Sequence, residues 1–323
     1  MQNSNPIQLV SRVPGIGGSL LVLIGFVLIG MAVGNILAVM VLALYLHVDT
    51  SSITGVLTQL LSNPGEVSNG WYALMLLQGT VHFFSYLLPS LVFWIYIDRK
   101  SIAEFDFRPK PAFRVWLLAF LLVLAFIPVN SKFIEWNAAM KLPDALSELE
   151  LWMKEKENQL SVMTAFMTEY TQFGQLLVAL FVVVLLPALG EEVLFRGVIQ
   201  TKLIKLWGNP HVGIWVAAAI FSAIHFQFYG FLPRMMLGAV FGYLYYWTGN
   251  IWVAILAHFV NNGFVLVMMY LNNIGAVSID VEETKSMPVM LILSSLLVSA
   301  GILFSIRKTS AMQKEPLLMD KEF

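Results

Sequence analysis

The sequence predicts an all-α polytopic membrane protein with about eight transmembrane helices. Of its 323 residues, 58% are hydrophobic and only 12% are charged, whereas soluble domains average roughly 45–50% and about 25%. The apolar residues occur in long runs, and a bilayer span needs about 20 of them. The net charge of −1 and the absence of cysteine argue against a nucleic-acid partner, disulfide bonds, thiol catalysis and thiolate metal sites.

Eight apolar runs are candidate spans. The first is long enough to cross a bilayer, so we expect it to stay in the mature protein rather than act as a cleaved signal peptide. The third to sixth runs are shorter than the others, so the helices they predict can extend beyond the apolar residues. The candidates are Ile16 to Leu46, Trp71 to Ile97, Val115 to Val129, Leu176 to Leu189, Val212 to Phe226, Met235 to Trp247, Ile251 to Leu271 and Val289 to Ile306.

The basic residues predict the orientation of these spans. With eight spans and both termini in the cytoplasm, 13 of the 19 lysines and arginines fall on the cytoplasmic side, as the positive-inside rule requires. We therefore expect a multi-pass integral membrane protein, in the plasma (inner) membrane if the host is bacterial.

The one sizeable polar stretch runs from Asn130 to Gln172 and contains a predicted helix over Asp144–Leu160. Its stripe of apolar residues favours an amphipathic helix on the membrane surface, and a lid or substrate-guiding element is the alternative. We divide the chain into amino-terminal spans and this segment (1–170), a catalytic helix bundle (171–275), and the last span with a polar cytoplasmic tail (276–323).

Ionisable residues inside the apolar half are the strongest functional signal. Between Tyr170 and Ile279 the only acids are Glu191 and Glu192, and charges at membrane depth usually mark a functional pathway. We estimate the depth of each residue by counting along its helix from the turn at the cytoplasmic face. On this measure Glu191 lies roughly 25 Å from that face, His225 roughly 21 Å, and His258 with Asn262 roughly 12–18 Å. Three helices can therefore bring these side chains together.

Local spacing suggests how the roles divide. Glu192 and Arg196 are four residues apart, which favours an ion pair on one helix face, and we interpret this pair as structural. Glu191 points about 100° away from it and is free for chemistry. His258 and Asn262 also share a face. His82 and Gln78 on the second span are interpreted as packing residues, with a place in the wall of the same cavity as the alternative.

Glu191, His225 and His258 form a sufficient ligand set for one divalent metal ion, most consistent with zinc. Without a metal, a Glu–His pair can still activate water as a general base, and the Asn262 amide can donate to an oxyanion. With or without a metal ion, the predicted reaction is hydrolysis of a peptide bond in a membrane-anchored peptide or protein. A Glu/His relay carrier and a non-catalytic immunity or scaffolding protein remain alternatives.

Three motifs carry a family resemblance: Glu191–Glu192–Val–Leu–Phe–Arg196, Phe221–Ser–Ala–Ile–His225 and His258–Phe–Val–Asn261–Asn262. Together they resemble the signature of the CAAX prenyl endopeptidase and bacteriocin-processing (CPBP, or Abi) family of eight-helix intramembrane proteases, over about Gln175 to Leu271. The resemblance implies that Glu191 and His225 activate water. It further implies that His258 and Asn262 stabilise the oxyanion or help hold a metal, with Glu192 and Arg196 as structural partners.

Overall fold

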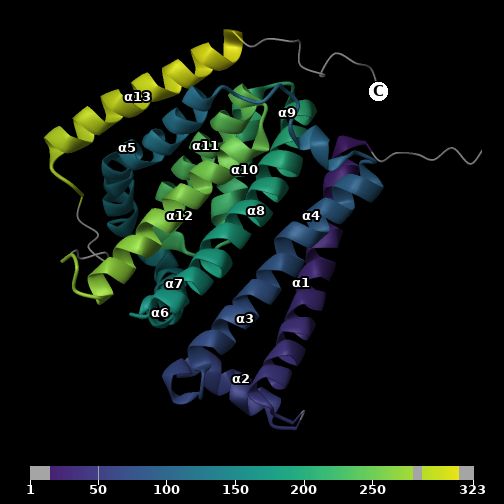
Figure 1. Cartoon of the computed structure of the whole chain (residues 1–323), viewed down its shortest axis with the longest axis vertical. Helices are drawn as coiled ribbons and strands as arrows, with labels where there is room; N and C mark the ends of the chain where they lie inside the picture. Colours follow the sequence, from purple (N-terminus) through teal and green to yellow (C-terminus); the bar gives the residue numbers. More distant parts are fainter. Residues whose placement is uncertain (1–14, 50, 279–285, 313–323) are drawn as a thin grey trace, which may run out of the picture.

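The computed structural model describes residues 15–49, 51–278 and 286–312, and this part of the chain is helical with no β-strand (Figure 1). The predicted all-α class is confirmed. The α-helices are α1 (Ile16–Leu46), α2 (Ile53–Ser62), α3 (Gly70–His82), α4 (Leu88–Val92), α5 (Phe113–Ala138), α6 (Ser147–Thr168), α7 (Phe173–Ala179), α8 (Leu186–Glu192), α9 (Thr201–Trp207), α10 (Pro210–Ala223), α11 (Phe231–Thr248), α12 (Ile251–Asn273) and α13 (Val289–Met312).

Several of these helices are joined end to end by π-helical segments, in which the turns are wider than in an α-helix. The π-helical segments are Phe83–Leu87, Phe93–Ile97, Leu180–Leu185 and Val193–Gln200. Short 3₁₀-helices cover Pro64–Glu66, Ile102–Phe105, Asp144–Leu146 and Phe228–Gly230.

Six helices of the described residues are long and apolar enough to cross a membrane: Ile16–Leu46, Gly70–Ile97, Phe113–Ala138, Phe173–Trp207, Ile251–Asn273 and Val289–Met312. The fifth and sixth predicted spans correspond to α10, which has only 14 residues, and to α11, which has 18. They pack against each other between the longer helices. Eight is therefore an approximate number of spans, whereas the multi-pass architecture is confirmed.

The helix of the fourth span is much longer than its apolar run, as the depth estimate for Glu191 assumed. It continues from Phe173 to Trp207 over 35 residues, although the apolar run appeared to end at Leu189. The first four polar residues beyond that point are all buried: Glu191, Glu192, Arg196 and Gln200. Hydropathy cannot recognise such a segment, because the polar groups satisfy one another inside the bundle.

Glycines allow α1 to lie close to the second span. A Cβ atom on Gly30 would stand 2.3 Å from the carbonyl oxygen of Phe84, and one on Gly34 would stand 2.8 Å from the Phe84 Cβ. The spacing of four places both glycines on one face, as in other small-residue contacts between membrane helices. The second span in turn contacts α8 through its π-helical segment, so the amino-terminal helices lie beside the helix that carries Glu191.

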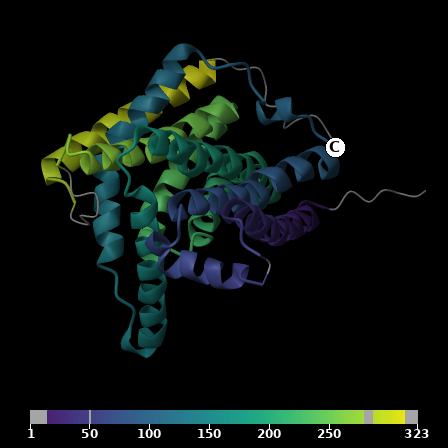
Figure 2. The same ribbon diagram turned by 60° about the horizontal axis from the view of Figure 1, so that its bottom comes forward.

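The polar stretch forms the predicted helix, but α6 continues to Thr168, eight residues beyond the expected end, and none of its residues is buried. Figure 2 shows α6 extending beyond the rest of the helices. It contacts the bundle near the start of α11: the Trp152 ring lies 5.5 Å from that of Phe228, and Glu157 accepts a long hydrogen bond from the Tyr229 amide. Whether α6 lies on the membrane surface or guides substrate stays a prediction.

The start of α1 and the end of α13 lie toward the same end of the bundle (Figure 1). This arrangement is the one expected if both termini lie on the same side of the membrane. The side itself stays a prediction. Most of the predicted polar tail, residues 313–323, lies outside the described residues.

Candidate active site

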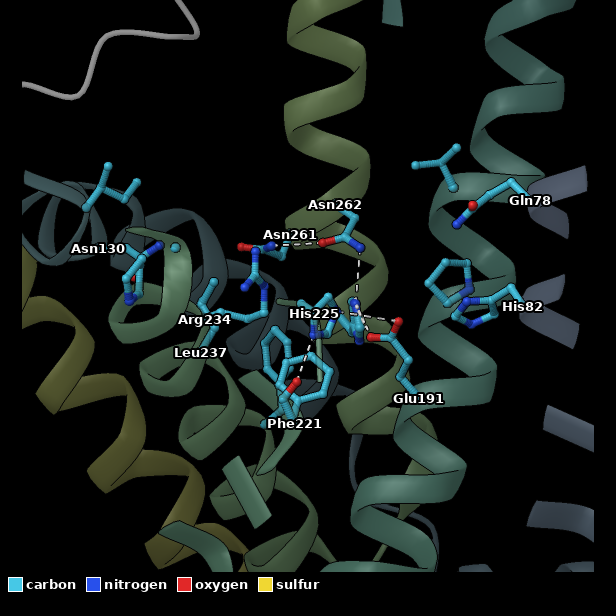
Figure 3. A pocket seen from close by; sticks show the side chains of 17 residues that line it. Gln78, His82, Asn130, Glu191, Phe221, His225, Arg234, Leu237, Asn261 and Asn262 are labelled. Carbon is cyan, nitrogen blue, oxygen red and sulfur yellow. Dashed lines mark hydrogen bonds and ion pairs between the residues drawn. The ribbon is translucent and has the colours of Figure 1, made fainter. Parts of the chain in front are cut away.

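Three helical elements bring the predicted site residues together (Figure 3). Glu191 belongs to α8, His225 follows α10, and His258 with Asn262 belongs to α12. The Glu191 Oε1 atom lies 3.9 Å from His225 Nε2, and its Oε2 atom lies 3.8 Å from His258 Nε2. The convergence expected from the depth estimates is therefore present in the structure.

The turn after α10 orients His225. Its Nδ1 atom lies 2.7 Å from the backbone carbonyl oxygen of Phe221. Since a carbonyl can only accept a hydrogen bond, this contact assigns the proton to Nδ1 and leaves the Nε2 lone pair facing Glu191. The next residue, Phe226, has a φ of 53°, a left-handed conformation that bulky residues rarely adopt.

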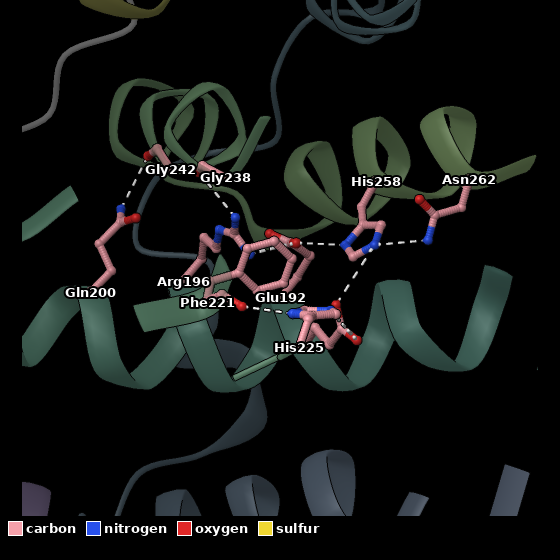
Figure 4. Close-up of polar contacts among 10 residues, drawn as sticks. Glu192, Arg196, Gln200, Phe221, His225, Gly238, Gly242, His258 and Asn262 are labelled. Atoms are coloured by element: carbon pink, nitrogen blue, oxygen red, sulfur yellow. Dashed lines mark hydrogen bonds and ion pairs between the residues drawn. The ribbon is translucent and has the colours of Figure 1, made fainter. Parts of the chain in front are cut away.

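Glu192 orients His258. One oxygen, Glu192 Oε1, lies 2.8 Å from Arg196 Nη1 and 2.8 Å from His258 Nδ1 (Figure 4). The carboxylate therefore forms the expected i, i+4 ion pair and also accepts a hydrogen bond from the imidazole. As with His225, the proton is assigned to Nδ1, so the Nε2 lone pair of His258 faces Glu191.

Two adjacent amides extend this chain of contacts. Asn262 Nδ2 lies 3.1 Å from His258 Nε2, and Asn261 Nδ2 donates to Asn262 Oδ1 at 3.0 Å. The four-residue spacing from His258 favours Asn262 over its neighbour Asn261. The structure shows that Asn261 also lines the cavity and contacts the Asn262 amide.

The Arg196 guanidinium is held on several sides. It donates to Glu192 and, through Nη2, to the carbonyl oxygen of Gly238 at 3.0 Å. Its Cζ atom lies 4.6 Å from the ring centroid of Phe221 and 5.6 Å from that of Phe241. Four residues on, Gln200 donates to the carbonyl oxygen of Gly242 at 3.1 Å. The close approach of α11 to this segment thus fixes both polar side chains.

A cavity of about 470 Å³ opens among these residues. Its wall contains Glu191, His225, His258, Asn261 and Asn262, together with polar residues that the sequence analysis did not assign to the site. These additional residues are Gln78, His82, Asn130 and Arg234. In the predicted loop between the fifth and sixth spans, residues 227–234, Arg234 is the only charged residue, and this isolation was the available signal.

His82 lies in the cavity wall rather than only in a packing interface. Its ring stacks on Tyr86, with centroids 4.6 Å apart, and its Nε2 atom lies 3.1 Å from the position that a Cβ on Gly190 would occupy. This Nε2 atom is buried and has no hydrogen-bond partner among the described residues. The amino-terminal spans therefore contribute to the cavity beside Glu191.

The donor atoms of Glu191, His225 and His258 are of the types that bind a metal ion, although they lie farther apart than the ligands of one ion do. Both imidazoles turn an Nε2 lone pair toward the Glu191 carboxylate while Nδ1 faces a carboxylate or carbonyl oxygen, as histidine ligands of zinc commonly do. The separations of 3.8 and 3.9 Å exceed the roughly 3.3 Å expected between tetrahedral zinc ligands. Accordingly, no three His, Cys, Asp or Glu side chains in the described part of the chain are positioned to hold an ion.

Comparisons with known proteins cover the helices that carry this site. Residues 173–264 match the family model of Type II CAAX prenyl endopeptidase Rce1-like proteins. The chain is 40% identical over 80 residues to the uncharacterized protein YpbD of Bacillus subtilis, which covers 24% of this chain and 38% of that protein. No solved structure matches the chain.

Two further relatives have names that describe an activity. The membrane-embedded CAAX protease MroQ of Staphylococcus aureus is 34% identical over 99 residues, which cover 29% of this chain and 40% of MroQ. The putative membrane peptidase YdiL of Bacillus subtilis is 33% identical over 78 residues, covering 24% of this chain and 32% of YdiL. The similarity thus spans less than half the length of each relative.

The matched residues contain all three motifs that suggested the resemblance, and they include Glu191, His225, His258 and Asn262. The predicted family resemblance is therefore confirmed for residues 173–264, which match the family model of Type II CAAX prenyl endopeptidase Rce1-like proteins.

Proposed function

We propose that this protein is an intramembrane endopeptidase that hydrolyses a peptide bond of a membrane-anchored peptide or protein. The observation that carries the proposal is the position of the Glu191 carboxylate between two imidazole Nε2 atoms, at 3.9 and 3.8 Å, in the wall of a cavity. The match to the family model and the names of MroQ and YdiL support the same class of activity.

Glu191 and His225 are suited to activate water. The assigned tautomer gives both groups an acceptor facing the other, so they cannot hydrogen-bond directly. One water molecule can donate one hydrogen to each across a separation of 3.9 Å, and contacts of this length are commonly bridged by water. Its oxygen lone pairs then point away from both bases, toward a substrate carbonyl in the cavity.

Hydrolysis then follows in two steps. The water oxygen bonds to the carbonyl carbon as its proton passes to Glu191 or His225, and the carbonyl π electrons move to the oxygen as an oxyanion. The C–N bond then breaks, and the same proton is delivered to the leaving amine, so atoms and charge balance. We assign the oxyanion contact to the Asn262 amide, which lies 3.1 Å from His258 Nε2, because His258 Nε2 itself is an acceptor in the assigned tautomer.

If a divalent metal ion takes part, Glu191, His225 and His258 are the residues that would hold it, and zinc is the ion their chemistry favours. A bound ion would act as a Lewis acid toward the scissile carbonyl. Glu192 and Phe221 would then orient the two histidine ligands through their Nδ1 atoms.

The test is cleavage of a membrane-anchored peptide library by the purified full chain in bilayers. We expect Glu191→Gln and His225→Ala to abolish cleavage while thermal unfolding stays close to that of the wild type. His211→Gln is the matched histidine control, since His211 is exposed and contacts Tyr243 outside the cavity.

Full cleavage by either cavity variant would refute the proposed mechanism. Solute transport that is lost in both variants, with no cleavage by the wild type, would favour a carrier instead. A wild-type chain that shows neither activity would favour a non-catalytic role.

A further inference from the structure

Two arginine side chains lie near the proposed catalytic residues, one buried (Arg196) and one half-buried (Arg234), and their surroundings differ sharply. Arg196 is 1% exposed and is neutralised by Glu192 at 2.8 Å. Arg234, in the first turn of α11, has no carboxylate within 4.0 Å among the described residues. Glu191 and Glu157 act on Arg234 only at longer range.

The hydrogen bonds of Arg234 are also incomplete. Its Nη2 atom donates to the side-chain oxygen of Gln227, whereas the buried Nη1 atom has no partner among the described residues. A guanidinium carries five N–H donors. Leaving a buried donor of a cation unsatisfied, with no carboxylate in contact, is costly and calls for an explanation.

Arg234 lines the same cavity as the proposed catalytic residues. On α5, Asn130 also lines this cavity, and its Oδ1 atom is buried without a partner. Two unsatisfied polar groups in one cavity wall call for an explanation. Because an amide can rotate to present its NH₂ group, Asn130 and Arg234 can both donate hydrogen bonds to one anionic ligand.

The position of Arg234 is fixed by the fold rather than by the side chain alone. On α5, the 3% exposed Asn137 donates to the Phe228 carbonyl oxygen at 2.9 Å and accepts from the Leu232 amide at 2.6 Å. These two bonds hold the turn that begins α11. The guanidinium is therefore presented to the cavity from a rigid support, as binding sites require.

We infer that Arg234 binds a carboxylate of the peptide substrate, with Asn130 as a second donor. The planar guanidinium matches a carboxylate with two parallel N–H bonds. In a peptide, the carboxylate is either the C-terminus or an acidic side chain, and both present the same chemistry. The inference rests on the proposed peptidase function, and it makes Arg234 a specificity-determining residue that selects bonds close to a carboxylate.

The test measures binding without catalysis. The full chain carrying Glu191→Gln is reconstituted in bilayers of a zwitterionic lipid and mixed with a pool of fluorescent, membrane-anchored peptides without acidic side chains. These peptides are made in two forms, one ending in a free carboxylate and one ending in an amide. A third form ends in the amide and carries one added glutamate, its only acidic side chain. The free carboxylate should bind at least about tenfold more tightly than the amide, as expected for hydrogen bonds to a charged group.

Arg234→Gln should remove this preference, and Arg234→Lys should retain part of it, since lysine keeps the charge without the planar pair of donors. The lysine variant also provides a result if the glutamine variant fails to fold. Arg114→Gln is the matched control, because Arg114 is exposed and contacts Ser305 on α13, away from the cavity. Tight binding of the third form would identify a side-chain carboxylate as the group recognised, whereas its absence would identify the C-terminus.

Three results would overturn the inference: equal binding of all forms, an unchanged preference in Arg234→Gln, or loss of the preference when phosphatidylglycerol is added to the bilayer. The last would assign the site to a lipid phosphate. A carboxylate preference in a protein whose wild type cleaves nothing would leave this inference intact and reject the peptidase proposal, so the two can fail separately.

Discussion

His258 Nδ1 lies 2.8 Å from Glu192 Oε1, the same oxygen that binds Arg196. Glu192 therefore joins the structural ion pair to the imidazole that faces Glu191. Its carboxylate is fully buried, and its second oxygen has no hydrogen-bond partner among the described residues. This contact makes Glu192 a positioning residue for His258 as well as a partner for Arg196.

Glu192→Gln should separate these two roles. The amide retains the size of the carboxylate but carries no charge to hold the Nδ1 proton of His258, so we expect kcat for peptide cleavage to fall roughly 10- to 100-fold, as for other groups that orient histidines. The chain should remain folded. Glu192→Ala should instead leave Arg196 unpaired in the bundle and reduce the free energy of unfolding by about 3–5 kcal/mol. A glutamine variant with wild-type kcat would show that Glu192 is purely structural.

Asn262→Ala should reduce kcat roughly 10²- to 10³-fold with little change in KM, because the amide is expected to donate to the oxyanion in the transition state. Asn261→Ala is the matched comparison. It removes the 3.0 Å bond to Asn262 but no proposed donor, and it should have the smaller effect on kcat. Steady-state kinetics on one cleavable peptide would measure both, and equal effects would contradict the role given to Asn262.

Gly242→Ala should destabilise the bundle. The added Cβ would stand 2.6 Å from Gln200 Oε1 and 2.9 Å from Ile214 Cγ2, so Gln200 would have to give up its bond to the Gly242 carbonyl. Overpacking of this kind costs about 1–3 kcal/mol. Gly301→Ala on α13 is the control, since nothing lies within 4 Å of the added atom. Thermal unfolding in detergent should distinguish the two, and equal midpoints would show that α11 can move away.

Metal content tests the predicted ligand set independently of activity. If Glu191, His225 and His258 hold an ion, the purified protein should contain about one zinc per chain, and His258→Ala should lower this value. A chelator should remove the zinc and stop cleavage, and added zinc should restore both. Full cleavage by a preparation shown to be metal-free would mean that Glu191 and His225 activate water unaided.

Much of this protein is determined by local features of its sequence. Long apolar runs can only be accommodated in lipid as helices, because every backbone polar group must be paired there. The isolated Glu191–Glu192 pair and the i, i+4 spacing of His258 and Asn262 are likewise properties of single helices. Hydropathy, charge and motif spacing were therefore sufficient to predict the all-α class, the family and the candidate residues.

The tertiary structure decided the features that depend on contacts between distant segments. The fourth span continues through Glu191, Glu192 and Arg196, because their partners on α11 and α12 make the polar segment stable in the bundle. The same packing placed His82 and Arg234 in one cavity with the proposed catalytic residues. No periodicity along a single helix reports such contacts, because they depend on how the helices pack against one another in three dimensions.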